Sequence, residues 1–153
     1  MADVVSPEVR SRMMSGIRST NTKPELILRQ GLHAMGFRFR LHDRKLPGKP
    51  DIVFPRYRAV IFAHGCFWHG HDCHLFKWPS TRSDFWQKKI IRNQEKDHEV
   101  HEALDSIDWR HGVVWECALK GREQLPLEQV LDNCASWLTS TELYFEMRGQ
   151  KLQ

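Results

Sequence analysis

The stretch I-F-A-H-G-C-F-W-H-G-H-D-C, residues 61–73, decides how this chain is organised. Its first two residues are apolar and indicate the end of a strand, which Gly65 then breaks. Three side chains of the kinds that bind zinc follow in the loop: Cys66, His71 and Cys73. A structural zinc site is almost always four-coordinate, so we expect a fourth ligand from another part of the chain.

Two further cysteines are candidates for that fourth ligand. Cys117 lies in W-E-C-A, just past a predicted strand, and is the better candidate. Cys134 lies among apolar residues of a predicted helix, where a cysteine packs as a small hydrophobic side chain. The alternative is that residues 66–73 hold buried cysteines beside ordinary surface histidines. The density of donors in a short, glycine-broken loop favours the metal.

The composition is that of one globular domain. The chain has 153 residues, of which 41% are hydrophobic and 27% charged, so we predict a single domain over residues 1–153. No apolar run reaches the ~18 residues that a membrane span needs, and the first residues carry no secretory-signal pattern. Four cysteines without an export signal indicate reduced thiols in the cytoplasm. The net charge of +4 is compatible with nucleic acid but does not establish it.

Helix and strand signals predict an α/β fold, a mixed sheet flanked by helices. The expected helices cover residues 6–15, 21–36, 83–107 and 125–138. The expected strands cover residues 37–42, 51–54, 59–63, 109–116 and, at the edge, 143–147. Ser83 and Asp84 are the expected cap of the long helix, and Met35 and Leu127 are expected on buried faces.

Asp51 is the candidate ligand of a catalytic cation. It opens one strand of a predicted antiparallel hairpin, which brings it close to Ala63 and His64 on the other strand. Mg²⁺ takes one or two carboxylates and completes its shell with water and phosphate oxygens, and the Ala63 carbonyl is a candidate neighbouring donor. His64 and His69 can activate water or move a proton near neutral pH. Together these residues indicate metal-assisted hydrolysis of a phosphodiester. The alternative is that Asp51 only caps a turn.

Three other features each allow two interpretations. Glu25 shares the predicted buried stripe of its helix with Leu28, so it needs a partner or a role there, or it only complements the helix dipole. Phe67 and Trp68 are either aromatics that stack on or wedge between bases, or a small cluster over the zinc. Residues 1–20 are either a DNA-contacting arm or a solvated segment.

Three motifs resemble the bacterial very-short-patch-repair (Vsr) family of DNA mismatch endonucleases: P-G-K-P-D at 47–51, F-A-H-G-C-F-W-H-G-H-D-C at 62–73 and W-E-C-A-L-K-G-R-E at 115–123. The resemblance covers about residues 6–138. It implies a restriction-endonuclease-like fold with a structural zinc. It also implies nicking of one strand, 5′ of the thymine, in T:G mismatches left by deamination of 5-methylcytosine. The implied setting is a bacterial monomer in the cytoplasm that binds nucleoid DNA and contacts mismatch-repair proteins.

The resemblance also implies a role for each candidate residue. Catalysis would fall to Asp51, which binds Mg²⁺ together with Ala63, and to His64, His69 and the supporting carboxylate Glu25. The implied zinc ligands are Cys66, His71, Cys73 and Cys117. The implied side chains that open the duplex are Phe67, Trp68, Trp86 and, from the N-terminal arm, Met14. Two positions depart from the family pattern, since Ala63 replaces a threonine and Gly70 replaces a histidine.

Two other functions explain part of the pattern. A zinc-stabilised DNA-binding module without catalysis explains the metal-binding loop but leaves Asp51, His64 and His69 without a role. A nuclease of the same fold with another target, such as a restriction enzyme, explains everything except mismatch selectivity. Nicking assays on matched and mismatched duplexes distinguish the three.

Overall fold

The computed structural model describes residues 21–151, so Met14 and the arm of residues 1–20 lie outside the described residues. Within residues 21–151, no helix combines the length and the apolar character needed to cross a membrane. The elements follow in the order α2 Lys23–Ala34, β1 Arg40–Leu41, β2 Ile52–Phe54, the 3₁₀ turn η1 Pro55–Tyr57, β3 Ala59–His64, α3 Ser83–Ser106, β4 Arg110–Trp115, α4 Glu116–Leu119, α5 Leu127–Leu138 and β5 Tyr144–Met147.

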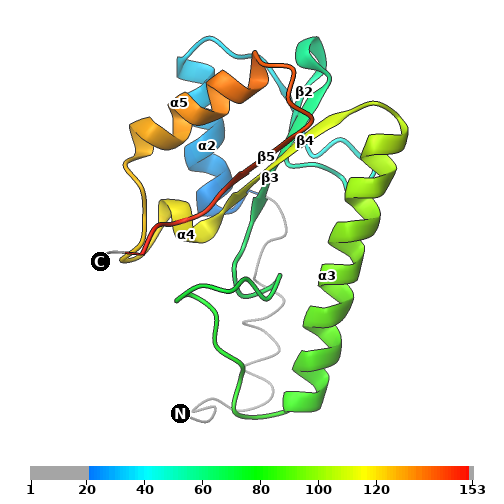
Figure 1. Ribbon diagram of the computed structural model, residues 1–153, viewed down its shortest axis with the longest axis vertical. Helices are drawn as coiled ribbons and strands as arrows, with labels where there is room; N and C mark the ends of the chain where they lie inside the picture. The colour runs from blue at the N-terminus through cyan, green and yellow to red at the C-terminus, as the bar shows by residue number, and fades with distance from the viewer. Residues whose placement is uncertain (1–20, 152–153) are drawn as a thin grey trace.

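A five-stranded mixed sheet, in the order β1-β2-β3-β4-β5, forms the centre of the described chain (Figure 1). β1, β2 and β3 are antiparallel neighbours, whereas β3, β4 and β5 run parallel. Parallel neighbours need a long crossover, and α3 supplies it between β3 and β4. The predicted mixed sheet with flanking helices and the predicted hairpin of residues 51–54 and 59–63 are confirmed.

Strand β3 divides its side chains between two hydrophobic clusters, as the period of a pleated strand requires. Ala59 and Ile61 join the cluster formed with α2 and α5, whereas Val60 and Phe62 join the cluster formed with α3. Figure 1 shows α2 and α5 together on one side of the sheet and α3 on the other. Because both faces are covered, β3 is an unbroken apolar run until it reaches the site at its end.

Four local predictions are wrong, all at the ends of elements. Met35 and Leu127 are 44% and 45% exposed, because Met35 follows the last residue of α2 and Leu127 is the first residue of α5. The expected Ser83 cap is replaced by Arg82, which precedes α3 with a φ of 53° and makes no capping hydrogen bond with its side chain. The first expected strand, residues 37–42, shrinks to β1, and His42 at its C-terminal end leaves the extended conformation with a φ of 49°.

Leu104→Ala should lower the free energy of unfolding by about 2–5 kcal/mol, because Leu104 is fully buried where α3 packs on the sheet. Urea unfolding followed by circular dichroism measures the loss. Ile91→Ala, on the same helix but 50% exposed, is the matched control and should change stability by no more than about 0.5 kcal/mol. Equal losses in the two variants would contradict this account of how α3 is anchored.

Candidate active site and metal centre

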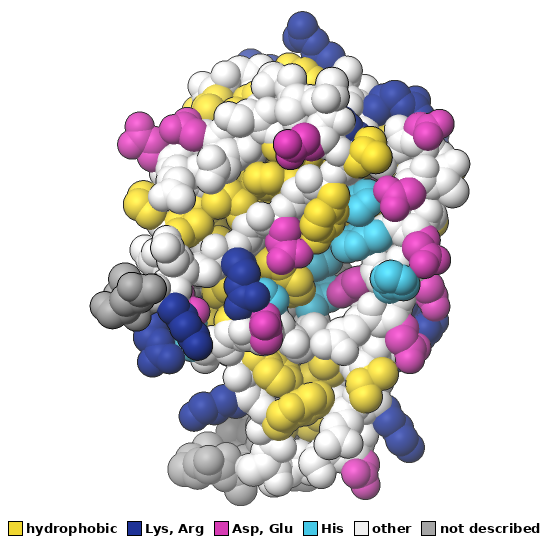
Figure 2. All heavy atoms as spheres, in the orientation of Figure 1, with side chains coloured by type: hydrophobic (Ala, Val, Ile, Leu, Met, Phe, Trp, Pro, Cys, Tyr) yellow, Lys and Arg dark blue, Asp and Glu magenta, His cyan; other side chains and the backbone are white. Residues whose placement is uncertain are grey.

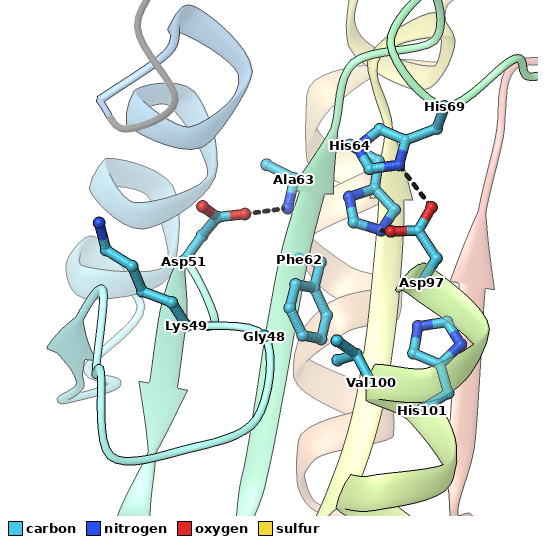
Figure 3. Close-up of a pocket in the computed structure, with 10 residues that line it drawn as sticks. All are labelled: Gly48, Lys49, Asp51, Phe62, Ala63, His64, His69, Asp97, Val100 and His101. Carbon is cyan, nitrogen blue, oxygen red and sulfur yellow. Dashed lines mark hydrogen bonds and ion pairs between the residues drawn. The ribbon is translucent and has the colours of Figure 1, made fainter. Parts of the chain in front are cut away.

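Asp51 lies immediately before β2, opposite the end of β3. Its carboxylate accepts a hydrogen bond of 2.8 Å from the Ala63 backbone N–H, and Figure 3 shows the two residues facing each other across the hairpin. The pairing of Ile52 with Ile61 sets this register, because one further step along each strand brings Asp51 beside the last residues of β3. The hairpin therefore holds the Asp51 carboxylate at the open end of its two strands, beside the last residues of β3, as the sequence predicted.

The environment of Asp51 disfavours a lone negative charge. The pKa of Asp51 is raised from its ordinary value to about 6, chiefly by burial; the hydrogen bond from the Ala63 N–H lowers it and the negative charge of Glu25 raises it. A cation at this carboxylate would offset the cost of burial and favour the ionised form. A cation bound next to Asp51 would therefore stabilise the site.

Two stacked histidines face the same carboxylate of α3. The rings of His64 and His69 lie 3.9 Å apart between centroids with an interplanar angle of 21°. His69 Nδ1 lies 2.5 Å from Asp97 Oδ2, and His64 Nε2 lies 3.8 Å from Asp97 Oδ1, beyond hydrogen-bond distance. Burial lowers the pKa of His64 well below its ordinary value, with a smaller contribution from His69, so the His64 imidazole is neutral at neutral pH.

The carboxylate of Asp51 and the histidine pair line one cavity of about 240 Å³ (Figure 3). Figure 3 shows Asp51 and Ala63 on one side of it and His64, His69 and Asp97 on the other. On the face that Figure 2 draws, histidine side chains gather with acidic ones beside α3. The full lining is Gly48, Lys49, Asp51, Phe62, Ala63, His64, His69, Asp97, Val100 and His101.

Glu25, on α2, is fully buried, and its carboxylate has three polar partners. Its carboxylate accepts hydrogen bonds from Arg29 Nη1 at 2.8 Å and the Asn21 backbone N–H at 3.0 Å, and lies 2.8 Å from His42 Nε2. One ligand atom from each of Glu25, His42 and Asp51 falls within 4.8 Å of the others, so Glu25 adjoins the catalytic candidate. Its place in the first turn also suits the helix dipole, but only the ion pairs account for a buried carboxylate.

A second cluster brings together four donors from two segments of the chain. One ligand atom from each of Cys66, His71, Cys73 and Cys117 lies within 4.8 Å of the others, and the first three come from the loop after β3 while Cys117 comes from α4. His71 Nδ1 lies 3.6 Å from Cys66 Sγ and 3.6 Å from Cys117 Sγ. Tetrahedral zinc with bonds of about 2.3 Å to sulfur and about 2.0–2.1 Å to nitrogen separates S and N by about 3.6 Å. The donor set therefore fits zinc in both chemistry and spacing.

Burial raises the pKa of the Cys66 and Cys117 thiols above their ordinary values, so a metal must displace protons when it binds. Cys134, by contrast, is buried in the cluster formed with α2 and α5, next to none of these donors. Burial raises the pKa of Cys134 to about 12, as expected of an inert structural thiol. The structure thus places Cys117, and not Cys134, among the metal-binding candidates.

Gly70 in the metal-binding loop has a physical reason for lacking a side chain. Its φ is +59°, and a Cβ there would lie 2.6 Å from Gln94 Nε2 and 2.7 Å from Ile90 Cγ2 on α3. Gln94 also donates a hydrogen bond of 3.1 Å to the His69 carbonyl. A glycine at this position lets the loop approach α3 closely, which holds His69 near Asp97.

The candidate wedge residues form an aromatic cluster where the loop meets the first turn of α3. Phe67 lies 5.3 Å from Trp68 and 5.3 Å from Trp86 between ring centroids, and Trp68 lies 5.8 Å from Trp86. Trp86 is 6% exposed, whereas Phe67 and Trp68 are half-buried. Figure 2 shows hydrophobic side chains at the surface beside this end of α3. Both sequence interpretations remain open, because the rings pack together and still reach the surface.

Comparison with known proteins decides the family. A model of the family described as "DNA mismatch endonuclease Vsr" matches residues 2–75. The chain is 46% identical over 138 residues to the DNA mismatch endonuclease Vsr of Escherichia coli, covering 90% of this chain and 88% of that one. This chain belongs to the Vsr family. It is 48% identical over 134 residues to the type II nicking enzyme V.XorIIP of Xanthomonas oryzae, covering 86% of this chain and 98% of the relative. A Vsr-family chain is a nuclease, a hydrolase that nicks DNA.

The sequence analysis missed Asp97 and His42. Asp97 follows Ile90 by seven residues and precedes Leu104 by seven, so it lies on the buried stripe of α3, which is the same signal that drew attention to Glu25. His42 carried no comparable signal, because its position depends on the turn that ends β1. Both reach the site from elements far from the motif of residues 61–73.

Cys117→Ser should lower zinc content and melting temperature together, because structural zinc contributes its binding free energy to folding. Cys134→Ser, also fully buried but distant from the four donors, is the matched control and should keep the zinc content of the parent chain. Atomic absorption and differential scanning calorimetry measure the two quantities. Equal loss of zinc in both variants would overturn the assignment of the fourth ligand.

Proposed function

We propose that this chain nicks one strand of duplex DNA on the 5′ side of the thymine in T:G mismatches that arise from deamination of 5-methylcytosine, and so begins very short patch repair. The observation that carries the proposal is the cavity in which the Asp51 carboxylate faces the His64–His69 pair and Asp97. Membership of the Vsr family supports the mismatch as the target. The proposed fold is restriction-endonuclease-like, in a single domain that acts as a monomer. The proposed setting is nucleoid DNA in the bacterial cytoplasm, where the chain would contact mismatch-repair proteins.

Asp51 and the Ala63 carbonyl are the proposed ligands of a catalytic Mg²⁺. Mg²⁺ bound there would polarise the phosphate and activate a water molecule. Asp51 suits the task because burial penalises its charge until a cation arrives. The alanine at position 63 keeps the backbone carbonyl, so loss of the expected threonine side chain leaves that ligand in place. Glu25, held by Arg29 and His42, supplies a fixed negative charge beside Asp51.

His69 is the proposed general base or water-orienting group. The contact of its Nδ1 with Asp97 favours the tautomer that carries the proton on Nδ1 and leaves a lone pair on Nε2. His64 stacks on His69 as a neutral ring and limits how far His69 can turn. His69 Nε2 would therefore accept a proton from a water molecule in the cavity. The His69 ring is held for this by Asp97 on one side and by His64 on the other.

Zinc at Cys66, His71, Cys73 and Cys117 is proposed to stiffen the loop that carries Phe67 and Trp68. A T:G pair stacks and pairs less well than a Watson–Crick pair, so opening the duplex there costs less. Aromatic side chains that enter the stack turn this difference into selectivity. Trp86 lies below them as a buried support from α3. Met14 is proposed to act from the N-terminal arm, outside the described residues.

Asp51→Asn should fold and bind a T:G duplex but nick it about 10³-fold more slowly or worse, because the cation supplies several kcal/mol of transition-state stabilisation. The amide oxygen can still accept the Ala63 N–H. Without added magnesium the variant should be more stable than the parent at pH 8, by at most about 3 kcal/mol. The sign follows from the raised pKa, since the parent loses stability as the pH rises from the ordinary value of 3.8 to about 6, so the advantage should shrink below about 6 and vanish below 3.8.

A panel of T:G, other mismatched and fully matched duplexes, with and without Mg²⁺, tests the proposal. His69→Ala is the graded comparison and should keep some metal-dependent nicking, since a general base typically contributes about 10²–10⁴-fold. Nicking by Asp51→Asn at the parental rate would reject this active site. Equal nicking of matched and T:G duplexes by the parent would instead indicate a same-fold nuclease with another target. Mismatch binding without any nicking would leave a DNA-binding module.

Phe67→Ala combined with Trp68→Ala should keep the zinc but lower the ratio of T:G to matched binding, and the nicking rate with it. Salt-dependent binding to phosphates should persist, because it comes from lysine and arginine side chains elsewhere. Both affinities are measured at one fixed salt concentration. Phe85→Ala, an aromatic of the same helix end that is 43% exposed, is the control. An unchanged ratio in the double variant would mean that these rings only pack over the zinc.

A further inference from the structure

Residues 148–150, directly after β5, contact the two segments that carry the zinc ligands: Arg148 contacts Asp72 in the metal-binding loop, Gly149 contacts Cys117 on α4, and Gln150 contacts Glu123, which follows α4; we call these three residues the C-terminal clasp. They lie more than 70 residues along the chain from the loop of residues 66–73. None of the roles described above uses them. Their contacts converge on the zinc ligands and on the residues between those ligands.

The first contact is a hydrogen bond to a ligand sulfur. The Gly149 backbone N–H donates to Cys117 Sγ at 3.2 Å. The Cys117 backbone N–H in turn donates to Cys66 Sγ at 3.3 Å. Two of the candidate thiolates thus each accept one backbone N–H. Hydrogen bonds of this kind disperse thiolate charge and orient the sulfur, and such outer contacts set metal affinity.

Close packing against two backbone carbonyls explains why the clasp has a glycine at position 149. A Cβ at Gly149 would lie 2.5 Å from the Cys117 carbonyl oxygen and 2.6 Å from the Glu123 carbonyl oxygen. Both are backbone atoms and cannot swing aside. Gln150 fixes the same approach, because its backbone N–H donates to the Glu123 carbonyl at 2.9 Å. Only a residue without a side chain lets the clasp come close enough to reach the sulfur.

Arg148 contacts the zinc centre on the side of the loop, at Asp72. Arg148 donates from Nη1 to Asp72 Oδ1 and from Nη2 to the Asp72 carbonyl, each at 2.8 Å. Asp72 stands between the ligands His71 and Cys73. One guanidinium therefore fixes both the side chain and the backbone of the residue that links two ligands, while the next residue reaches the third ligand, Cys117.

We propose that the C-terminal clasp is a built-in part of the zinc centre: Gly149 supplies a hydrogen bond to the Cys117 thiolate, and Arg148 fixes the His71–Cys73 segment, so that retention of the metal depends on the residues that follow β5. The clasp joins the edge strand β5 both to the loop, at Asp72, and to α4, at Cys117. Its residues act on the metal through the ligands and do not coordinate it. This role is independent of what the DNA site does.

Zinc-loaded protein tests the proposal through its affinity for zinc, measured by competition with a chromophoric chelator of known affinity. A chain that ends after Met147 lacks the clasp, and a chain that ends after Gln150 keeps it and is the matched control. Gly149→Ala and Arg148→Ala remove its two parts separately. We expect the Kd for zinc to rise roughly ten-fold or more in the shortened chain and in Gly149→Ala, with a smaller rise in Arg148→Ala. Gln150→Ala keeps the backbone N–H and should match the parent.

Cobalt substitution separates this role from a general loss of stability. The Cβ of Gly149→Ala should push the backbone N–H away from Cys117 Sγ. Without that hydrogen bond the sulfur lone pairs rise in energy, so the thiolate-to-cobalt charge-transfer band should move to longer wavelength. Arg148→Ala, which keeps the N–H, should leave the band in place. Parental zinc affinity in the chain that ends after Met147 would overturn the proposal. A weaker affinity in Gly149→Ala with an unshifted cobalt band would overturn the hydrogen bond to sulfur.

Discussion

The register of β3 with its two neighbours, β2 and β4, is the constraint on which both sites depend. The parallel pairing with β4 puts His64 beside Trp115, at the end of each strand. Cys66 and Cys117 each follow two residues later, so they leave the sheet at the same edge and meet. The antiparallel pairing of β3 with β2 on its other side, Ile52 opposite Ile61, brings Ala63 next to Asp51, whose carboxylate accepts the Ala63 N–H. A slip by one residue would exchange the faces of β3 and separate both constellations.

Three carboxylates lie in or beside the active-site cavity, and their contacts compensate them to different degrees. Glu25 is offset by Arg29 and His42, and Asp97 by His69, each through short contacts. Asp51 has only the Ala63 N–H as a hydrogen-bond donor among the described residues, and burial raises its pKa despite this hydrogen bond. The carboxylate with the least compensation is thus the one proposed to bind the catalytic cation. Such a local cost is typical of sites that carry out chemistry.

Helix α3 acts as a frame for the metal-binding loop as well as a cover for the sheet. Its first turns hold Trp86 under the aromatic cluster, and its middle presents Asn93, Gln94 and Asp97 to the loop. Asn93 donates to the Trp68 carbonyl at 2.8 Å, so the loop backbone is bound at the residue that carries a candidate wedge. The C-terminal clasp meets the same loop from the far end of the chain. The loop is therefore fixed from two sides, which is what a rigid wedge requires.

Local patterns in the sequence determined the mixed sheet, the hairpin, the long helix and three zinc donors, because period, turn chemistry and ligand spacing are properties of neighbouring residues. The preference for Cys117 over Cys134 also came from local context, since one follows a strand and the other lies in an apolar helix stripe. Only the tertiary structure decided which distant groups meet. Asp97, His42 and Gly149 reach their partners across 28, 17 and 32 positions of sequence separation. No local pattern encodes such contacts, because strand register and helix packing set them.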